Sequence, residues 1–333
     1  YMTTRSTTMS VSCAATPMFQ SKVTIAQSAV AGGLAGAVTR AIAQPLDVLK
    51  IRFQLQLEPI RNGSKYSSLL QAVSSIIREE GISTLWSGHI PAQMLSITFG
   101  VVQFSVYERL TQTCQKTDPQ FYLANKYWLN FSNGAIAATS ATILSYPFDT
   151  VRTRLIAEQK TNRAYNGFSN AFLKMVRHEG ASSLFKGIIP TMAQIAPYAG
   201  IQFFVYKLFT DNIFNRIRFF QRETTVGSII ETSIIANVLA GSIAGLVSKT
   251  AVYPFDVVKK RLQIQGFQQH RKAFGRQMYC RGSLHCIMLT INEEGFLALY
   301  KGYGPSLLKA MIVTALHFTV YDEIKHLILR TQK

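Results

Sequence analysis

The sequence predicts an all-α membrane protein of six membrane-spanning helices, arranged as three similar repeats that each add a short amphipathic helix at the membrane surface. Three observations support this prediction. An eight-residue cassette recurs at intervals of roughly 100 residues, as in a repeat architecture. Hydrophobic residues make up 48% of the 333 residues and charged residues only 16%, whereas soluble chains hold about 25% charged residues. The sequence lacks stretches of alternating apolar and polar residues, the pattern that would indicate paired strands.

The cassette consists of a proline, an acidic residue two positions later, a basic residue three positions beyond it, and a second basic residue two positions further. Its copies run from Pro45 to Arg52, from Pro147 to Arg154 and from Pro254 to Arg261. A proline inside a helix removes a hydrogen bond and bends the helix. A single copy fits a solvated helix end with a local ion pair, but three copies in register predict one shared structural role.

Each repeat contains the same segments in the same order. A span with small residues one turn apart, a spacing that favours close helix packing, leads into the cassette. An amphipathic helix follows, too polar to cross a membrane and closed by Glu-Gly, and a second apolar span completes the repeat. The six spans begin near Ser28, Ile90, Asn130, Ile188, Ile234 and Pro305, and the short helices occupy 66–80, 168–176 and 283–292. The chain therefore divides into a flexible tail at 1–24 and repeats at 25–116, 117–222 and 223–333.

The net charge of +18 suits anionic substrates, anionic lipid or nucleic acid. The basic residues recur at the cassettes and in the segments after them, and the six apolar spans oppose a soluble nucleic-acid-binding protein. Cys13, Cys114, Cys280 and Cys286 form no CxxC pair and no metal-like cluster with histidine. No acid, base and nucleophile converge in the sequence, so we expect neither a metal or cofactor nor an enzyme.

The first 22 residues are rich in Ser and Thr, contain Arg5 and hold no acidic residue. They lack the long apolar core of a secretory signal. Their composition fits a mitochondrial presequence or a plain disordered tail, and the sequence leaves both open.

Residues 25–329 resemble the mitochondrial carrier family. The tripled Pro-x-Asp-x-x-Lys/Arg-x-Lys/Arg cassette is that family's signature, and the Glu-Gly…aromatic-Lys-Gly segments at Phe185-Lys186-Gly187 and Tyr300-Lys301-Gly302 match the rest of it. The first repeat departs from the pattern, with Ser87 in Trp86-Ser87-Gly88. The resemblance implies a monomeric, multi-pass antiporter of the inner mitochondrial membrane that uses alternating access to a single central site, with its short helices on the matrix side.

The resemblance further implies a matrix gate, a ring of three ion pairs between neighbouring repeats. The implied pairs are Asp47 with Arg152, Asp149 with Lys259, and Asp256 with Lys50. Gln54 and Gln263 match the glutamines that brace such a ring, and Ile156 in the second repeat breaks the pattern.

A second ring is implied on the cytoplasmic side, where the family has an aromatic-acid-x-x-base pattern on the even-numbered spans. Its candidates are Glu108, Lys207, Asp322 and Lys325. Only Glu108 with Lys325 fits an intact pair, because Lys207 stands where an acid belongs. We therefore expect a weak cytoplasmic gate.

The family's substrate contacts, counted from the aromatic-base-Gly segments, fall near Leu95, Gln194-Ile195 and Lys309. Lys309 is the best candidate for an anionic group, since a cation in a narrow apolar cavity attracts phosphate. Arg40 and Lys249, each five residues before a cassette proline, would add charge towards the matrix gate. Tyr198, Gln202 and Gln103 would face the rest of the substrate, and helix–helix packing is the alternative for each of them.

Several segments resemble the thiamine pyrophosphate branch of the family, among them Gly88-His-Ile-Pro-Ala-Gln-Met, Pro197-Tyr-Ala-Gly-Ile-Gln-Phe and the stretch after Gln263. This implies exchange of thiamine pyrophosphate, with nucleotides as counter-substrates. Another phosphate-bearing cofactor, coenzyme A or a nucleotide, is the alternative. The glycine-started short helices, with Lys186 and Lys301 nearby, would hold cardiolipin head groups, unless their N-termini are ordinary caps.

Overall fold

The computed structural model describes residues 25–56, 65–159, 163–213, 221–223, 230–232, 234–266, 279–313 and 316. Residues 40–314 form one compact unit, and residues 1–39 with 315–333 form a second. In the second unit the described residues 25–39 are helical, as the first part of helix α1 (Ile25–Leu55). The site described below lies entirely within residues 40–314.

The repeat order predicted from the sequence is present in the helices. The long helices after α1 are α3 (His89–Thr117), α5 (Lys126–Ala157), α7 (Ile188–Lys207), α8 (Ile234–Gln263) and a helix over 303–313. The short amphipathic helices are α2 (Leu69–Glu80), α6 (Gly167–Glu179) and α9 (Ser283–Glu294), each followed by a single 3-10 segment: Ile82–Trp86, Ala181–Phe185 and Phe296–Tyr300. Helix α4 (Pro119–Ala124) joins α3 to α5, and a π-helical turn, Leu208–Ile213, ends α7.

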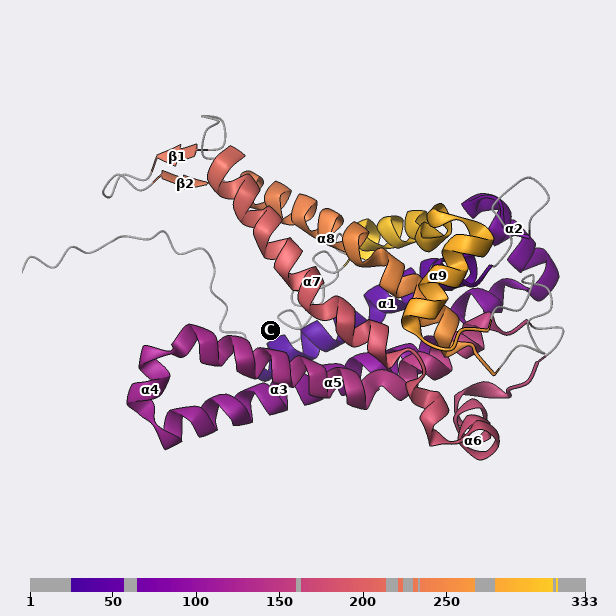
Figure 1. Ribbon diagram of the computed structural model, residues 1–333, viewed down its shortest axis with the longest axis horizontal. Coiled ribbons are helices and arrows are strands. Elements are labelled where there is room, and N and C mark those ends of the chain that lie inside the picture. Colours follow the sequence, from indigo (N-terminus) through magenta and orange to yellow (C-terminus); the bar gives the residue numbers. More distant parts are fainter. Residues whose placement is uncertain are drawn as a thin grey trace, which may run out of the picture. The chain divides into compact units, whose positions relative to one another are not determined.

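Length and hydropathy mark two described segments, Ile82–Thr117 and Ala181–Thr210, as able to cross a membrane. Helices α1, α5 and α8 carry the cassettes with their charged side chains, and the described part of the last long helix covers only 303–313. Helix α3 lies along α5, and α7 lies along α8 (Figure 1). Large apolar side chains of α3 point outward: Ile97, Val101 and Phe104 are 62%, 62% and 75% exposed.

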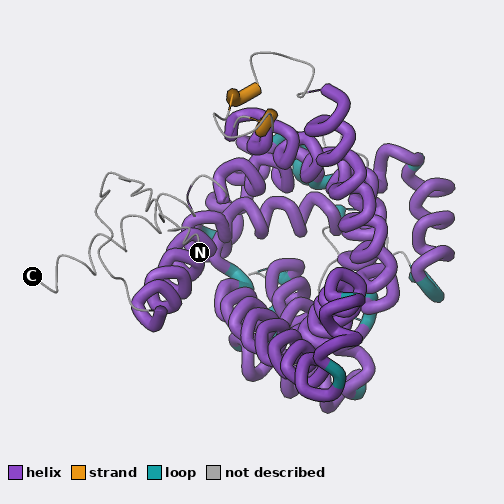
Figure 2. Tube along the Cα trace, turned by 90° about the vertical axis from the view of Figure 1, so that its left-hand side faces the viewer, coloured by secondary structure: helices purple, strands orange, loops and turns teal. Residues whose placement is uncertain are grey.

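The expectation of an all-α chain was incomplete. Strands β1 (Gln221–Glu223) and β2 (Ile230–Thr232) pair antiparallel between α7 and α8, with Arg222 opposite Glu231 in the register. They are the non-helical regular elements among the described residues (Figure 2). The stretch 224–230 is rich in β-branched residues and has Gly227 in its middle, a composition typical of strands joined by a turn. Sequence reading missed it because the stretch is short and has no helical periodicity.

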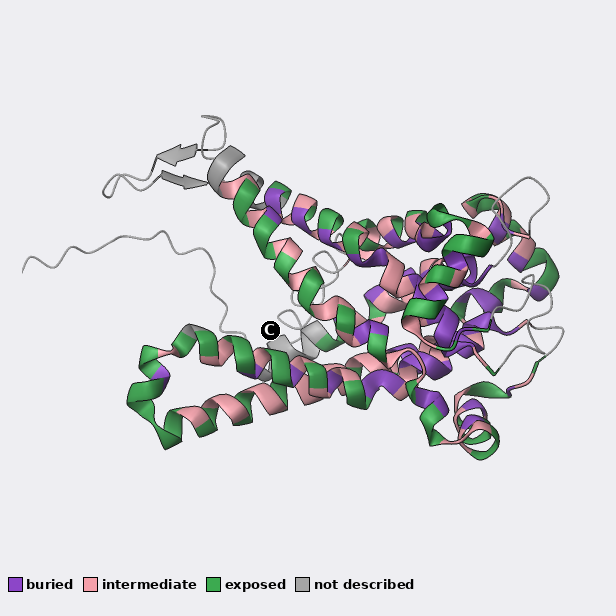
Figure 3. Ribbon diagram, viewed as in Figure 1, coloured by how far each residue is buried: buried purple, intermediate pink, exposed green. Residues whose placement is uncertain are grey.

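The buried residues gather where the short helices meet the ends of the long ones (Figure 3). In the first repeat, Leu49 and Phe53 of α1 pack against Ala72 and Ile76 of α2. Equivalent clusters join α5 to α6 and α8 to α9. The apolar face of each short helix is therefore buried against the cassette helix of its own repeat, which fixes the position of the charged residues between them.

Prolines interrupt the backbone hydrogen bonds of all three cassette helices. Pro45 has no N–H to donate to the carbonyl of Ala41, four residues earlier. The Trp86 indole replaces the missing donor, with its Nε1 3.0 Å from Ala41 O. The aromatic residue at the same position in the other repeats stacks on the tyrosine before the proline: Phe185 on Tyr146, and Tyr300 on Tyr253.

Candidate functional site

The three ion pairs implied by the family resemblance are present. Each joins the acid of one cassette to a base of the next, so together they connect α1 to α5, α5 to α8, and α8 to α1. The distances are 2.5 Å for Asp47 Oδ2 and Arg152 Nη2, 2.9 Å for Asp149 Oδ2 and Lys259 Nζ, and 3.2 Å for Asp256 Oδ2 and Lys50 Nζ. We call this set of six side chains the ion-pair ring.

The three corners of the ion-pair ring differ in how many cations they hold. Asp47 also contacts Lys309, with Oδ1 2.5 Å from Nζ, and Asp149 also contacts Lys260, with Oδ1 3.0 Å from Nζ. Asp256 forms an ion pair with Lys50 alone among the described residues. Its side chain is also the most exposed of the three acids, at 27% against 7% for Asp47 and 10% for Asp149.

The two glutamines expected to brace the ring make different contacts. Gln263 donates from Nε2 to Asp149 Oδ2 at 2.9 Å, so it touches the ring directly. Gln54 donates to the hydroxyl of Tyr253 at 3.0 Å and touches no acid of the ring. In the second repeat Ile156 is buried in an apolar cluster with residues such as Val48.

Sequence reading missed Gln44, the residue before Pro45. Its Oε1 accepts from Arg152 Nη2 at 3.3 Å, and its Nε2 donates to Ser87 O at 2.8 Å. The other two repeats have tyrosines there, and these lie beneath lysines of the ring: Lys259 over Tyr146 and Lys50 over Tyr253. Gln44 thus takes the position that an aromatic ring holds elsewhere.

Sequence reading also missed a second tier of ion pairs, formed by the last base of each cassette and the glutamate that ends each short helix. Each arginine binds both carboxylate oxygens of its glutamate, a geometry that gives strong, directional pairing. The pairs are Arg52 with Glu80, Arg154 with Glu179, and Arg261 with Glu294. The signal was in the sequence, because the three Glu-Gly steps recur at the same place in every repeat.

Two of these arginines also reach the next repeat. Arg52 Nε donates to Ile156 O at 3.2 Å, and Arg154 Nε donates to Gln263 O at 3.1 Å. Both carbonyls lie at the C-terminal end of a long helix, where backbone acceptors lack helical partners. Burial alone would raise the pKa of the Glu179 carboxyl, but hydrogen bonds and charge from Arg154 and Lys186 lower it below its ordinary value.

Three glycines bring the repeats into backbone contact. Gly88, Gly187 and Gly302 begin the second long helix of each repeat with φ of 71°, 84° and 77°. A Cβ at these positions would lie 3.1 Å from Arg152 O, 2.9 Å from Lys259 O and 2.8 Å from Lys50 O. Each contact is with the ring base of the following repeat, so only glycine has both the backbone angle and the space required.

The three cations expected to bind substrate lie beside the ring and are half-buried. Lys309, on the helix over 303–313, contacts Asp47 as described. Arg40 Nη1 donates to Ala92 O and Lys249 Nζ donates to Ser306 O, both at 3.0 Å. These acceptors are backbone carbonyls, so neither cation has its charge neutralised by the contact.

The uncharged residues expected to line the site are all half-buried: Leu95, Gln103, Gln194, Ile195, Tyr198 and Gln202. They lie on α3 and α7. Gln194 stands out, because its Oε1 is buried and has no hydrogen-bond partner among the described residues. A buried amide oxygen without a donor is costly unless a ligand or water supplies one.

The expected cytoplasmic gate is described only in part. Glu108 is exposed and accepts a hydrogen bond from Gln112 Nε2 at 3.1 Å, and Lys207 is exposed at the end of α7. Asp322 and Lys325 lie outside the described residues, so the expected pair of Glu108 with Lys325 stays a prediction.

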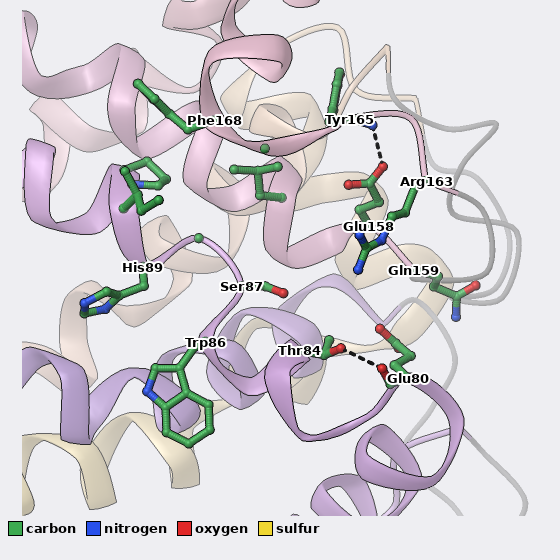
Figure 4. Close-up of a pocket in the computed structure, with 15 residues that line it drawn as sticks. Glu80, Thr84, Trp86, Ser87, His89, Glu158, Gln159, Arg163, Tyr165 and Phe168 are labelled. Atoms are coloured by element: carbon green, nitrogen blue, oxygen red, sulfur yellow. Dashed lines mark hydrogen bonds between the residues drawn. The ribbon is translucent and has the colours of Figure 1, made fainter.

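Three related pockets lie where the glycine-started segment of one repeat meets the short helix of the next. Their volumes are about 220, 250 and 330 Å³. Figure 4 shows the first, which is lined by residues such as Ser87 and His89 from one repeat and Glu158 and Tyr165 from the next. Glu158 accepts a hydrogen bond from the backbone N–H of Tyr165 at 2.8 Å. Lys301, which was expected to help hold lipid head groups beside the short helices, is buried and paired with Glu294.

Comparison with known proteins agrees with this repeated geometry. The family described as "Mitochondrial carrier protein" matches residues 21–118, 124–216 and 231–332. The chain is 40% identical over 299 residues to the mitochondrial thiamine pyrophosphate carrier of Homo sapiens, covering 89% of this chain and 90% of that protein. It is 37% identical over 311 residues to the mitochondrial thiamine diphosphate carrier 2 of Zea mays, covering 89% and 92%. The chain belongs to the mitochondrial carrier family of multi-pass inner-membrane transporters.

Proposed function

We propose that this carrier exchanges thiamine pyrophosphate across the inner mitochondrial membrane, with nucleotides as counter-substrates. The observation that carries the proposal is the 40% identity, over nine-tenths of both chains, to a carrier named for this substrate. The cluster of cations beside the ion-pair ring supports it, because a diphosphate needs several positive charges when it leaves water.

Six membrane-spanning helices would form the transport path, two from each repeat at 25–116, 117–222 and 223–333. Helix α1, with 31 residues, is about 46 Å long at 1.5 Å per residue, more than the roughly 30 Å core of a bilayer. The charged cassette residues would face the path and the outward apolar residues would face lipid. The short helices α2, α6 and α9 would lie on the matrix side.

The ion-pair ring would be the matrix gate. Its six side chains link the three cassette helices, and Gln263 and Gln54 support two of the corners, one directly and one through Tyr253. Opening to the matrix requires these helices to separate and the ion pairs to break. The conformation described here has all three pairs formed, which corresponds to a closed matrix gate. On the other side, Glu108 and Lys325, with Asp322 and Lys207, would form the weaker cytoplasmic gate.

The diphosphate would bind Lys309, Arg40 and Lys249. Lys309 would link substrate binding to the gate. Its ammonium contacts Asp47 of the gate, and a phosphate of the substrate would compete with Asp47 for that ammonium. Substrate binding would thus remove one of two cations from Asp47 and weaken the first corner of the gate. The free energy of binding is in this way coupled to opening.

The organic part of the substrate would contact α3 and α7. The unpartnered Oε1 of Gln194 would accept a hydrogen bond from the amino group of the pyrimidine ring. Leu95 and Ile195 would supply apolar contacts, and Tyr198, Gln202 and Gln103 would line the rest of the substrate site.

The three pockets beside the short helices would hold phosphate groups of anionic phospholipid, cardiolipin among them. Lys186, 35% exposed at its side chain, would support this in the second pocket. In the third pocket Lys301 is buried and paired with Glu294, so backbone N–H groups at the helix start would be the main hydrogen-bond donors to a phosphate.

Uptake of labelled thiamine pyrophosphate into liposomes that contain the purified protein tests the proposed function. Coenzyme A and nucleotides serve as competitors outside and as exchange partners inside. Saturable uptake that requires an internal anion supports the proposal. Absence of thiamine pyrophosphate uptake, together with uptake of coenzyme A, would overturn the substrate assignment.

A further inference from the structure

The Asp149 corner of the ion-pair ring holds a second cation from the cassette helix α8, Lys260, which the repeat pattern does not account for. Lys260 follows the ring base Lys259 in α8 and is buried, with 9% of its surface exposed. Its ammonium donates to Asp149 Oδ1 at 3.0 Å, Thr153 Oγ1 at 2.9 Å and Gln263 Oε1 at 3.0 Å. A lysine ammonium has three N–H donors, and here each has an oxygen acceptor.

Lys260 is specific to the third cassette. The equivalent positions in the first and second cassettes hold Ile51 and Thr153. Ile51 packs in a buried apolar cluster with Val48 and Leu55, and Thr153 is itself one of the acceptors for Lys260. The additional charge therefore acts at one corner only, between α5 and α8.

The position of Lys260 differs from that of Lys309, the extra cation at the Asp47 corner. Thr153 and Gln263, the other partners of Lys260, lie further towards the C-terminal ends of their helices than the ring itself. Lys309 lies with Arg40 and Lys249, the residues proposed to bind substrate. Lys260 thus contacts the ring from the side away from the proposed substrate site.

We propose that Lys260 is a gate-positioning residue that holds the α5–α8 corner closed, so that the matrix gate opens first at its other corners. This inference rests on the proposed gate function of the ion-pair ring. Two of the three acceptors of Lys260 belong to α5, and separation of α5 from α8 would leave its ammonium with Gln263 alone. The α8–α1 corner, with the single half-buried pair of Asp256 and Lys50, lacks such a second cation among the described residues.

Hydrogen exchange of the full-length carrier in lipid nanodiscs tests this inference. In Lys260→Met, backbone amides at 149–158 and 256–266 should exchange about tenfold faster than in the wild type, because buried hydrogen bonds to a charged group are lost. Amides at 47–55 should exchange at the wild-type rate. Lys260→Arg, which keeps the charge, should stay close to the wild type. Ile51→Met, at the equivalent position of the first cassette, is the matched control.

Unchanged exchange at the α5–α8 corner, or equal acceleration at all three corners, would overturn the inference. If Lys260→Met does not fold, Thr153→Val removes one acceptor and keeps the shape of the side chain, and it should produce a smaller change at the same corner. The measurement needs no substrate. A carrier that transports coenzyme A instead of thiamine pyrophosphate would therefore leave this result intact and overturn only the substrate assignment.

Discussion

Lys309 Nζ lies 2.5 Å from Asp47 Oδ1, while the other oxygen of Asp47 contacts Arg152 at 2.5 Å. One carboxylate of the proposed gate thus holds a lysine of the proposed substrate site. This contact gives a physical route by which an anionic substrate and the gate compete for one cation.

Asp47→Asn should tighten binding of thiamine pyrophosphate. Loss of the carboxylate frees Lys309 and Arg152, so a diphosphate no longer competes with Asp47. We expect the Kd to fall about tenfold, the scale of one hydrogen bond to a charged group. The increase in melting temperature with ligand concentration measures this Kd. Weaker binding in Asp47→Asn would show that Asp47 does not compete with substrate.

Charge reversal tests the ion-pair ring best at the Asp256–Lys50 corner, where each acid and base has a single partner in the ring. Asp256→Lys and Lys50→Asp each place like charges together, and each should reduce exchange by at least about tenfold. The double variant restores the pair with reversed polarity and should recover a large part of the rate. If the double variant is as inactive as the single ones, the two residues do not act as a pair.

Gly302→Ala should destabilise the carrier by about 1–3 kcal/mol, because alanine would require a strained backbone angle and would clash with a carbonyl. The φ of Gly302 is 77°, and a Cβ would lie 2.8 Å from Lys50 O. Gly304→Ala is the control, since a Cβ there meets nothing within 4 Å. The melting temperature of both variants in detergent checks this. A shift of equal size in the two would contradict the close backbone contact.

The second tier of ion pairs should make the carrier sensitive to acid. The lowered pKa of Glu179 means that its contribution to stability is complete above its ordinary value of 4.5 and is lost as the pH falls through the lowered pKa. The wild type should therefore lose stability as the pH falls below 4.5 towards the lowered pKa of Glu179, and Glu179→Gln should lose less stability over the same pH range. Melting temperatures measured between pH 3 and 7, at about one-unit steps, separate the two. Parallel profiles would show that the Glu179–Arg154 pair contributes nothing.

The six-span arrangement predicts where Trp128 lies. It is 74% exposed at the start of α5, packs edge-on against Phe131, and is one of two tryptophans in the chain. In Trp86→Phe it is the sole tryptophan, and its fluorescence, excited selectively over that of the tyrosines, should be quenched by brominated lipids because tryptophan favours the membrane interface. Quenching by an aqueous quencher alone would place α5 outside the membrane.

The sequence was most informative where the threefold repeat applies. Asp47, Asp149 and Asp256 find the bases of the next cassette because the three copies are in register, and a cyclic arrangement follows from the family resemblance. The short helices were predicted from their period and their Glu-Gly ends. The Arg–Glu tier follows the same repeat, but Glu80, Glu179 and Glu294 also fit ordinary helix ends, so their spacing alone does not predict the ion pairs.

The departures from the repeat could not be predicted in the same way. Lys260 is a single extra base beside Lys259, and only the packing of α5 against α8 shows that it binds Asp149. The bond from Trp86 to Ala41 depends on side-chain direction, and Gln44 takes a place that tyrosines hold in the other repeats. The pairing of β1 with β2 falls in a stretch too short for a periodic signal. These contacts depend on tertiary structure, which spacing along the chain does not give.

Exchange of thiamine pyrophosphate across a liposome membrane tests the central claim most directly. Vesicles with the wild-type carrier, loaded with unlabelled thiamine pyrophosphate, should take up the labelled compound. Lys309→Ala should abolish this uptake, and Lys116→Ala, which removes an exposed charge at the end of α3, should not change it. Wild-type vesicles that exchange coenzyme A or nucleotides but not thiamine pyrophosphate would contradict the proposed function.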